Sequence, residues 1–441
     1  MKKQLFVGAV AAFALSSVLA GVEGYGIKDL KLTSRLPWET LVDISFEVVP
    51  PQGATAKWVE LNIVASNGVD EIYVSDTSIS TRLAGTSGRQ HITWSPATDH
   101  SGMAYGNLKM YVSVKAEIVE HPPIMLVNLK DGSVSYAGLS ATNAVKRNFM
   151  LRDYMMLRHI PATTSDEWKA ISGGADFFWF GAPERDAGWD YKSDLDLKRE
   201  DRRHKVTLTK GFYMGVYPLT RGQVATLGYP GNDRMNLWME TATGLTYEKV
   251  RGADVRGAYC YPETADVDPN SIIGKIRAMT GLKFDLPTNF QWEYAARAGS
   301  TNAYLYTETD VVPSEQTLSS IKNIRACDTR CNRWGLYGMI GCCHQWTTTL
   351  GRTTDNDSSE TNFYKLEEDA TDPVGPAPAY DHGYRITRGS HHGAEGTTAK
   401  RGGGTANIRY RVYRIAYKYP MKSNNPAEFK FCGIRLCLTD D

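Results

Sequence analysis

The sequence lacks an excess of charge of either sign. It has 50 lysines and arginines against 49 aspartates and glutamates, and a formal net charge of +1 at pH 7. Removing residues 1–20 takes away two lysines, so 50 − 2 leaves 48 basic against 49 acidic residues. A chain this close to neutral lacks the basic footprint that phosphate groups attract, so we expect no nucleic-acid partner.

The sequence also lacks a long apolar run beyond its N-terminus, so we expect no transmembrane segment in the mature chain. The N-terminal run, residues 5–15, follows two lysines and is shorter than the roughly 20 apolar residues that a spanning helix needs. Val18 and Ala20 stand at the positions that a signal peptidase recognises. We therefore predict a cleaved signal peptide over residues 1–20 and an exported bacterial protein (periplasmic, cell-surface or secreted); a membrane anchor is the alternative.

Cysteine is scarce, and its total of seven is odd, which leaves at least one thiol unpaired. Cys327 and Cys331 are close enough in sequence to bridge across a loop. Cys342 and Cys343 are adjacent, where a mutual bond would be strained, so separate partners or free thiols are expected. A metal site is the weaker alternative, because no second Cys/His pair stands near them at zinc-like spacing.

Residues 31–119 alternate between apolar and polar side chains. Three runs carry the alternation, with apolar residues at 42, 44, 46 and 48, at 59, 61 and 63, and at 112, 114, 116 and 118. Such a pattern puts one face in a core and the other in water, which is typical of antiparallel strands. We predict an immunoglobulin-like or fibronectin-like β-sandwich over residues 21–120, with Trp94 in its core rather than exposed as a sugar platform.

Two consecutive prolines, Pro122 and Pro123, end that domain because they cannot continue a strand ladder. We interpret residues 121–150 as a connector with one more strand. Beyond it the pattern predicts only two helices, a short one over 222–228 and a clear one over 288–297 with Thr288 as its N-cap. Long polar connections, such as 351–384 and 391–408, predict a loop-rich second domain over residues 151–441.

The most specific sequence motif in the chain is LPTNFQWEYAARAG at residues 286–299. Four further motifs lie before and after it in the chain: VTLTKGFYMG at 206–215, WGLYGM at 334–339, RGS at 388–390 and GIRL at 433–436. Together they resemble the formylglycine-generating enzymes, also called sulfatase-modifying factor domains. The resemblance implies a compact, loop-rich α+β fold related to C-type lectins, often holding calcium.

This chain lacks the pair of thiols on which the oxidation chemistry of that family depends. Active relatives oxidise a sulfatase cysteine with two copper-binding thiols that follow the Arg-Gly-Gly-Ser word, whereas this chain has no cysteine between Cys343 and Cys432. Cys432 and Cys437 repeat the spacing of that pair, but within one closing strand they would face opposite sides. We therefore assign no catalytic residue, expect no copper, and predict a non-catalytic binding or structural protein; a formylglycine-generating oxidase acting on sulfatase cysteine is the alternative.

The motif that is associated with calcium binding in this family is also altered. Active relatives read GNVWEW where this chain reads GCCHQW at residues 341–346, and they carry an aspartate at the position of Gly338. Calcium prefers hard oxygen ligands, whereas Cys342 is soft and Gln345 is neutral. We therefore expect no cofactor. Calcium is the one metal ion that a domain of this fold could still bind, and we assign no metal ligands.

The region 391–430 has the composition of an adaptable binding surface, since its tyrosines alternate with arginines. Variable binding proteins that share this domain place their variable segment here. We predict a surface for an unidentified protein or glycan at His391, His392, Tyr410, Arg411 and Tyr413, with Trp346 beneath it. The alternatives are solvent-exposed loop histidines and a tyrosine-rich pair of core strands.

Iron-dependent sulfoxide synthases are disfavoured, because the N-terminal half lacks a histidine-rich helical module.

Overall fold

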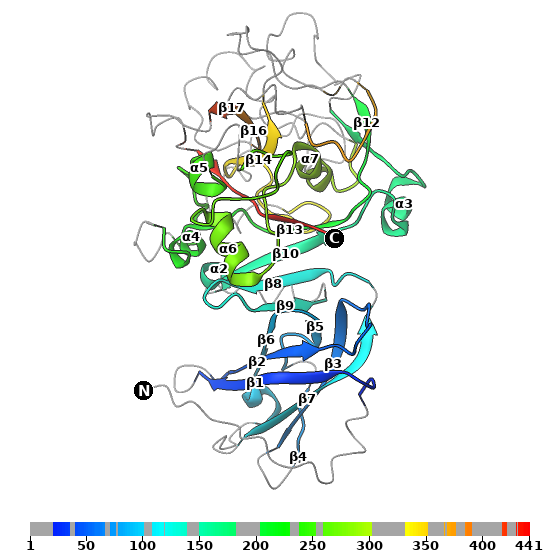
Figure 1. The fold of residues 1–441 in the computed structure, drawn as a ribbon, viewed down its shortest axis with the longest axis vertical. Helices are drawn as coiled ribbons and strands as arrows, with labels where there is room; N and C mark the ends of the chain where they lie inside the picture. The colour runs from blue at the N-terminus through cyan, green and yellow to red at the C-terminus, as the bar shows by residue number, and fades with distance from the viewer. Residues whose placement is uncertain are drawn as a thin grey trace, which may run out of the picture. The chain divides into compact units, whose positions relative to one another are not determined.

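The computed structural model divides the chain into two compact units, residues 1–147 and 148–441 (Figure 1). It describes residues 21–35, 40–66, 71–75, 78–100, 108–118, 120–138, 150–181, 203–229, 238–252, 259–301, 331–351, 366, 368–375, 384–389, 417–420, 429 and 431–441. The signal peptide predicted over residues 1–20 lies outside these ranges. No helix within these ranges is long and apolar enough to cross a membrane.

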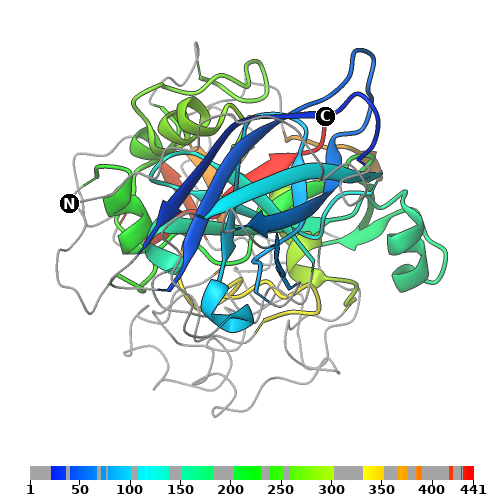
Figure 2. The ribbon, with the colours of Figure 1, turned by 90° about the horizontal axis from the view of Figure 1, so that it is seen from below.

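The described part of the first unit is built from strands and one helical turn (Figure 2). Its elements are β1 (Gly26–Ser34), β2 (Val42–Val49), β3 (Trp58–Ser66), β4 (Glu71–Ile72), β5 (Leu83–Gly85), β6 (Arg89–Trp94), α1 (Pro96–Asp99), β7 (Lys109–Ile118), β8 (Ile124–Asn128) and β9 (Val134–Ala137). The strands pair in the order β1–β2–β6–β9–β8, while β3 pairs with β4, β5 and β7. All these pairs are antiparallel except β6–β9.

The predicted alternation explains most of the first core. In β2 the apolar positions 42, 44, 46 and 48 are buried, and in β3 positions 59, 61 and 63 are buried. Trp94 is confirmed as a core residue with 0% exposure, and its Nε1 donates to Asp99 Oδ2 at 3.0 Å. In β7 only Val114 of the four predicted positions is fully buried. A bulge between Glu60 and Leu61 puts Ala116 and Ile118 opposite Glu60 and Trp58, out of phase with the core, while Val112 stays in phase and packs partly buried against it.

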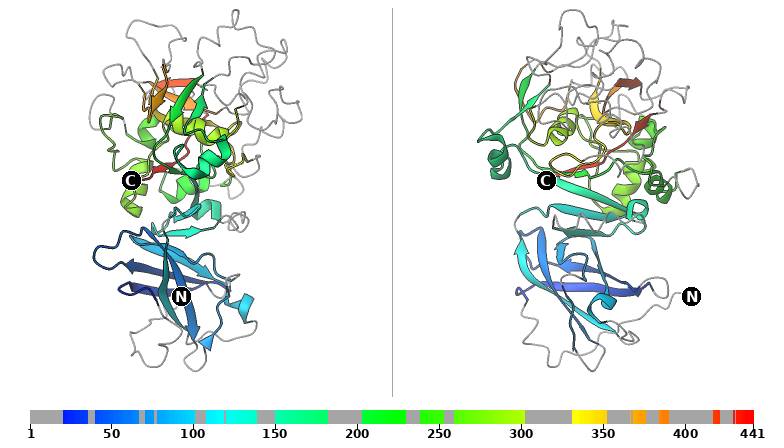
Figure 3. Two further views of the ribbon diagram at one scale, coloured as in Figure 1. Left: turned by 90° about the vertical axis from the view of Figure 1, so that its right-hand side faces the viewer. Right: turned by 180° about the vertical axis from the view of Figure 1, so that it is seen from behind.

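The second unit combines three sets of paired strands with short helices (Figure 3). Its helices are α2 (Met150–Asp153), α3 (Asp166–Ser172), α4 (Arg221–Thr226), α5 (Tyr247–Val250), α6 (Ile272–Thr280) and α7 (Asn289–Arg297). Its strands are β10 (Tyr154–Ile160), β11 (Phe178–Phe180), β12 (His204–Thr207), β13 (Phe212–Gly215), β14 (His344–Leu350), β15 (Ala370–Thr371), β16 (Tyr384–Arg388), β17 (Tyr417–Pro420), β18 (Cys432–Gly433) and β19 (Cys437–Thr439). They pair as β10–β13–β19, β11–β12–β15 and β17–β16–β14–β18.

Helix α7 begins where the sequence predicts. Thr288 Oγ1 accepts from the backbone N–H of Gln291 at 3.1 Å, and Gln291 Oε1 accepts from the N–H of Thr288 at 2.9 Å. This reciprocal capping box satisfies two N–H groups that a helix start leaves open. The helix buries Tyr294 against Trp168 and Trp334, with ring centroids 4.9 and 5.0 Å apart. Helix α7 therefore forms the centre of the second core.

Helix α6 was not predicted from the sequence. Gly274 inside it lowers the helical propensity of the segment. The structure supplies the reason for that glycine, because a Cβ there would lie 2.1 Å from the carbonyl oxygen of Asp268. Tertiary packing of Ile272, Ile273 and Ile276, all at 0% exposure, compensates for the weak local preference.

Candidate functional site

A buried ion pair connects the motif at 286–299 to the motif at 388–390, and helix α7 lies beside strand β16 (Figure 1). Arg388 Nη2 lies 2.9 Å from Glu293 Oε2, and both side chains have 0% exposure. Arg297, one helical turn after Glu293, donates through Nε to Glu293 Oε1 at 2.9 Å. The backbone N–H of Gly181 donates to the same oxygen at 2.8 Å. Glu293 therefore holds two arginines and one loop together.

Arg388 has further partners that orient it. Its Nε donates to Asn289 Oδ1, and its guanidinium carbon lies 5.4 Å from the ring centre of Phe180 and 5.7 Å from that of Trp292. A guanidinium held by a carboxylate, an amide and two rings has a fixed position. The segment that follows Gly389 consequently starts from a rigid point.

Gln345 is the second polar centre, and it lies between α7 and the closing strands. Its Oε1 accepts from Trp292 Nε1 and from Arg435 Nε, both at 2.9 Å. Its Nε2 donates to the carbonyl oxygens of Gly338 at 2.8 Å and Met339 at 3.2 Å. Gln345 has 0% exposure, so these four bonds satisfy a fully buried amide.

The altered family positions converge on this amide. Gly338 has a φ of +61°, and a Cβ there would lie 2.8 Å from Cys342 Sγ. A Cβ on Gly389 would lie 2.7 Å from the carbonyl oxygen of Met339 and 3.0 Å from that of Cys343. Several carbonyl oxygens therefore face the volume around Gln345 Nε2. The side chains present do not fit a calcium ion at this place, because the glutamine offers N–H groups to the carbonyls and the cysteine offers soft sulfur.

Two of the described thiols lie in the core. Cys343 has 0% exposure and Cys437 has 2%, and burial raises the pKa of both thiols well above the usual range. Burial of this kind disfavours the thiolate, which is the nucleophilic and metal-binding form of cysteine. The prediction that Cys432 and Cys437 share one closing strand is wrong. Cys432 lies in β18 opposite His344, whereas Cys437 lies in β19 opposite Met214, in different sheets.

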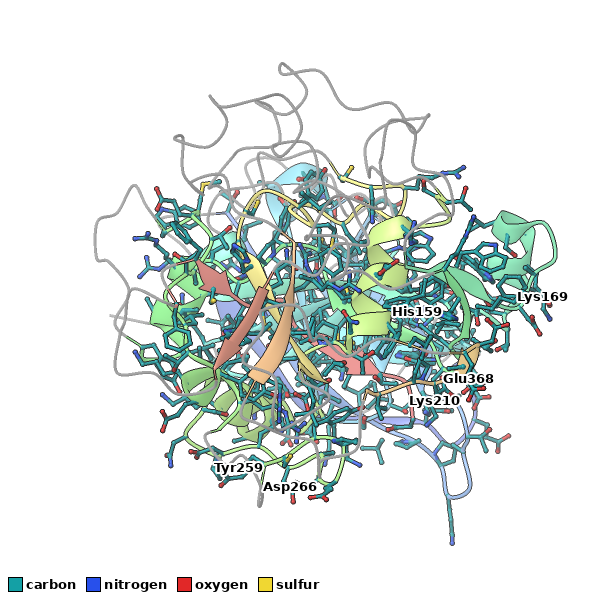
Figure 4. The ribbon with its side chains drawn as sticks, turned by 90° about the horizontal axis from the view of Figure 1, so that it is seen from above. His159, Lys169, Lys210, Tyr259, Asp266 and Glu368 are labelled. Atoms are coloured by element: carbon teal, nitrogen blue, oxygen red, sulfur yellow. The ribbon has the colours of Figure 1, made fainter. Side chains whose placement is uncertain are left out.

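The side chains labelled in Figure 4 differ in exposure from the two polar centres. Lys210, Asp266 and Glu368 are exposed, whereas Lys169 and Tyr259 are half-buried. Glu293 and Gln345 have 0% exposure, so the two polar centres support the fold from within.

Trp346 is the one predicted site residue within the described ranges. It has 0% exposure, and its Nε1 donates to the carbonyl oxygen of Leu245 at 2.8 Å. Its ring lies 5.5 Å from that of Tyr247 and 6.3 Å from that of Phe429. Trp346 is thus an internal support. The other predicted residues, His391, His392, Tyr410, Arg411 and Tyr413, lie outside the described residues.

Part of the tyrosine-rich region is described. Strand β17 pairs with β16, with Tyr417 opposite Thr387 and Tyr419 opposite Arg385. Glu293 and Arg435 are buried connectors that the sequence alone did not predict. The available signal was the presence of charged residues inside otherwise apolar words, with Glu293 and Arg297 one helical turn apart.

Comparisons with known proteins place these features in context. Residues 170–438 match the family model of the sulfatase-modifying factor enzyme 1-like domain. Among solved structures, the chain is similar to Treponema denticola variable protein 1, with 13% identity and a TM-score of 0.38, over 65% of this chain and 95% of that one. It is also similar to PvdO from Pseudomonas aeruginosa, with 17% identity and a TM-score of 0.35, over 64% of this chain and 94% of that one. No curated protein matches the chain.

Proposed function

The chain belongs to the sulfatase-modifying factor enzyme 1-like domain family, and from that premise we propose that it is an exported, non-catalytic protein that uses this domain to bind a partner. The partner is a protein or a glycan. The first unit, with alternating strands around one core, acts in this proposal as an immunoglobulin-like β-sandwich that presents the second unit.

The observation that carries the proposal is the burial of the thiols Cys343 and Cys437. Oxidation of a substrate cysteine in this family depends on two accessible thiols that bind copper(I) together. Cys343 and Cys437 are both buried, burial raises the pKa of each thiol above its usual range, and Cys343 lies just before β14 whereas Cys437 lies in β19. The sequence places no other cysteine between Cys343 and Cys432. These two observations support a chain without the reactive pair of a thiol-copper oxidase.

The binding surface is proposed for the segment that follows Gly389. Arg388, which precedes this segment, is fixed through Glu293, and strand β17 pairs with β16 further along the chain. Sequence between such anchored points is well suited to binding, because it can change without loss of the fold. His391, His392, Tyr410, Arg411 and Tyr413 are the contact residues of this proposal.

One experiment separates this proposal from the oxidase alternative. The purified protein is incubated with copper(I), oxygen and a cysteine peptide of the sulfatase type, and the peptide is analysed by mass spectrometry. The proposal predicts an unchanged cysteine mass. Conversion of the cysteine to an aldehyde would establish an oxidase and overturn the proposal.

The binding function has its own test. The same protein is applied to an array of glycans and exported proteins, beside a variant that carries Tyr410→Ala and Arg411→Ala. A saturable signal that the variant loses supports the proposed surface. A signal that the variant keeps in full would place the site elsewhere on the chain.

A further inference from the structure

Gln345 stands at the centre of a group of backbone carbonyl oxygens. Its Nε2 donates to Gly338 O at 2.8 Å and to Met339 O at 3.2 Å. The carbonyl oxygens of Met339 and Cys343 also lie close to the Cα side of Gly389, within 2.7 and 3.0 Å of where a Cβ would stand. Converging carbonyl oxygens in a buried place need a positively charged or N–H group among them.

The orientation of the amide follows from its neighbours. On its other side Gln345 meets two donors, Trp292 Nε1 and Arg435 Nε, both at 2.9 Å. The reversed orientation would set N–H groups against these donors and an oxygen against the carbonyls, so the network permits one orientation. The N–H groups therefore point at the carbonyl oxygens.

We propose that the side-chain amide of Gln345 takes the place of a calcium ion, so that this turn is held together without metal. The partial positive charge of the N–H groups balances the carbonyl oxygens that a cation would otherwise balance. Gly338 and Cys342 complete the change, because the space that a side chain at 338 would need holds Cys342 Sγ. Arg435, which binds the opposite end of the amide, also disfavours a cation there by charge repulsion.

A single substitution tests the idea. In Gln345→Glu one carboxylate oxygen can still accept from Trp292 and Arg435, while the other faces the carbonyl oxygens of residues 338 and 339. Two sets of oxygens facing each other are unfavourable unless a cation or a proton lies between them, and the positive charge of Arg435 opposes protonation of the carboxylate. The variant should consequently need calcium where the wild-type protein does not.

The measurement is the melting temperature of the full-length protein in 10 mM calcium and in excess chelator. We expect the wild-type value to be the same in both conditions. For Q345E we expect a lower value in chelator and a rise of about 5 °C with calcium, the effect of an ion present at roughly 100 times its dissociation constant. Terbium luminescence excited through tryptophan should appear in Q345E and be displaced by calcium, because Trp292 contacts this position.

Gln223→Glu is the matched control. Gln223 is also a buried glutamine at 3% exposure, but its Nε2 donates to a single carbonyl oxygen, that of Tyr154. Its substitution should lower the melting temperature without creating a response to calcium. Gln345→Ala serves as a second control, since it removes the amide and adds no ligand.

Three results would overturn the proposal. The first is a calcium response of the wild-type protein that Q345A abolishes, since it would show an ion already bound at this place. The second is a Q345E variant whose stability does not respond to calcium. The third is a Q345E variant that fails to fold with calcium present throughout while Q345A folds. If neither variant folds, the wild-type protein alone decides, by whether calcium changes its melting temperature.

Discussion

Glu293 and Arg388 are 95 residues apart in sequence, yet their side chains form an ion pair of 2.9 Å with no exposed surface. The pair connects helix α7 to the strand that leads into the proposed binding segment. Replacing such a pair by apolar residues can be neutral, but removing one member leaves a buried charge without compensation. This relationship makes Glu293 a sensitive position.

The first prediction concerns that pair. Glu293→Gln leaves Arg297 and Arg388 buried beside a neutral amide, so we expect a loss of about 3–5 kcal/mol in the free energy of unfolding. Urea denaturation followed by tryptophan fluorescence measures it. Glu248→Gln on the exposed face of α5 is the control and should change stability by less than about 0.5 kcal/mol. A loss in E293Q as small as in the control would show that the ion pair does not stabilise the fold.

The second prediction separates backbone strain from steric clash at Gly338. Gly335 and Gly338 both have positive φ, +76° and +61°, but a Cβ on Gly335 meets nothing within 4 Å whereas one on Gly338 meets Cys342 Sγ at 2.8 Å. Gly338→Ala should therefore cost about 1–3 kcal/mol more than Gly335→Ala. Adding Cys342→Ala should recover part of that difference in a double-mutant cycle. Equal costs at the two glycines would contradict the clash.

The third prediction concerns acid stability of the first unit. Burial alone would raise the pKa of Asp99, but hydrogen bonds from Ser75, Ser78 and Trp94 outweigh it and lower the pKa to about 2. Because the folded pKa lies below the unfolded value of 3.8, Asp99 stabilises the fold above about pH 4 and loses this effect as the pH falls toward 2.

Asp99→Asn should thus destabilise by about 1–2 kcal/mol at pH 7 and progressively less below pH 4. Thermal unfolding at pH 7 and pH 3 measures the difference. Glu60→Gln, which removes one carboxylate of the exposed ion pair with Lys115, is the control with a small effect at both pH values. A difference between wild type and D99N that is independent of pH would exclude a charged Asp99 as the cause.

The fourth prediction tests the proposed binding surface. Tyr410→Ala and Arg411→Ala should each weaken partner binding by about 1–3 kcal/mol and leave the melting temperature nearly unchanged. Trp346→Ala should instead cost about 3–5 kcal/mol of stability, because Trp346 is fully buried. If the Tyr410 and Arg411 variants unfold the domain without a separable effect on binding, the tyrosine-rich strands are core.

The fifth prediction concerns the connector. Limited proteolysis should cut first on the C-terminal side of the buried strands β8 and β9, at the boundary between the two units near residue 147, and release a fragment of about 290 residues, because the boundary between compact units has few stabilising contacts. Mass spectrometry identifies the cut. First cleavage within 31–119 would argue against an independent first domain.

Local patterns in the sequence determined the elements whose cause is local. The period-two alternation in residues 42–48 predicts a strand with one buried face, and Thr288 after Pro287 predicts the N-cap of α7. The words at 286–299 and 388–390 identify the family, which the match over residues 170–438 confirms. Each of these signals depends on residues that are close together in the chain, so it can be recognised in a single sequence.

Tertiary structure alone decided what the polar residues of those words do. Gln345 reads as an eroded calcium ligand in the sequence, but the structure gives it four hydrogen bonds to Trp292, Arg435 and the turn at 338–339. Gly338 reads as a lost aspartate, but it leaves room for Cys342 Sγ. These partners come from separate elements, and their distances depend on how the elements pack. A single sequence contains no measure of that packing, so the same residues indicate loss of chemistry when read along the chain and a buried hydrogen-bond network when seen in the fold.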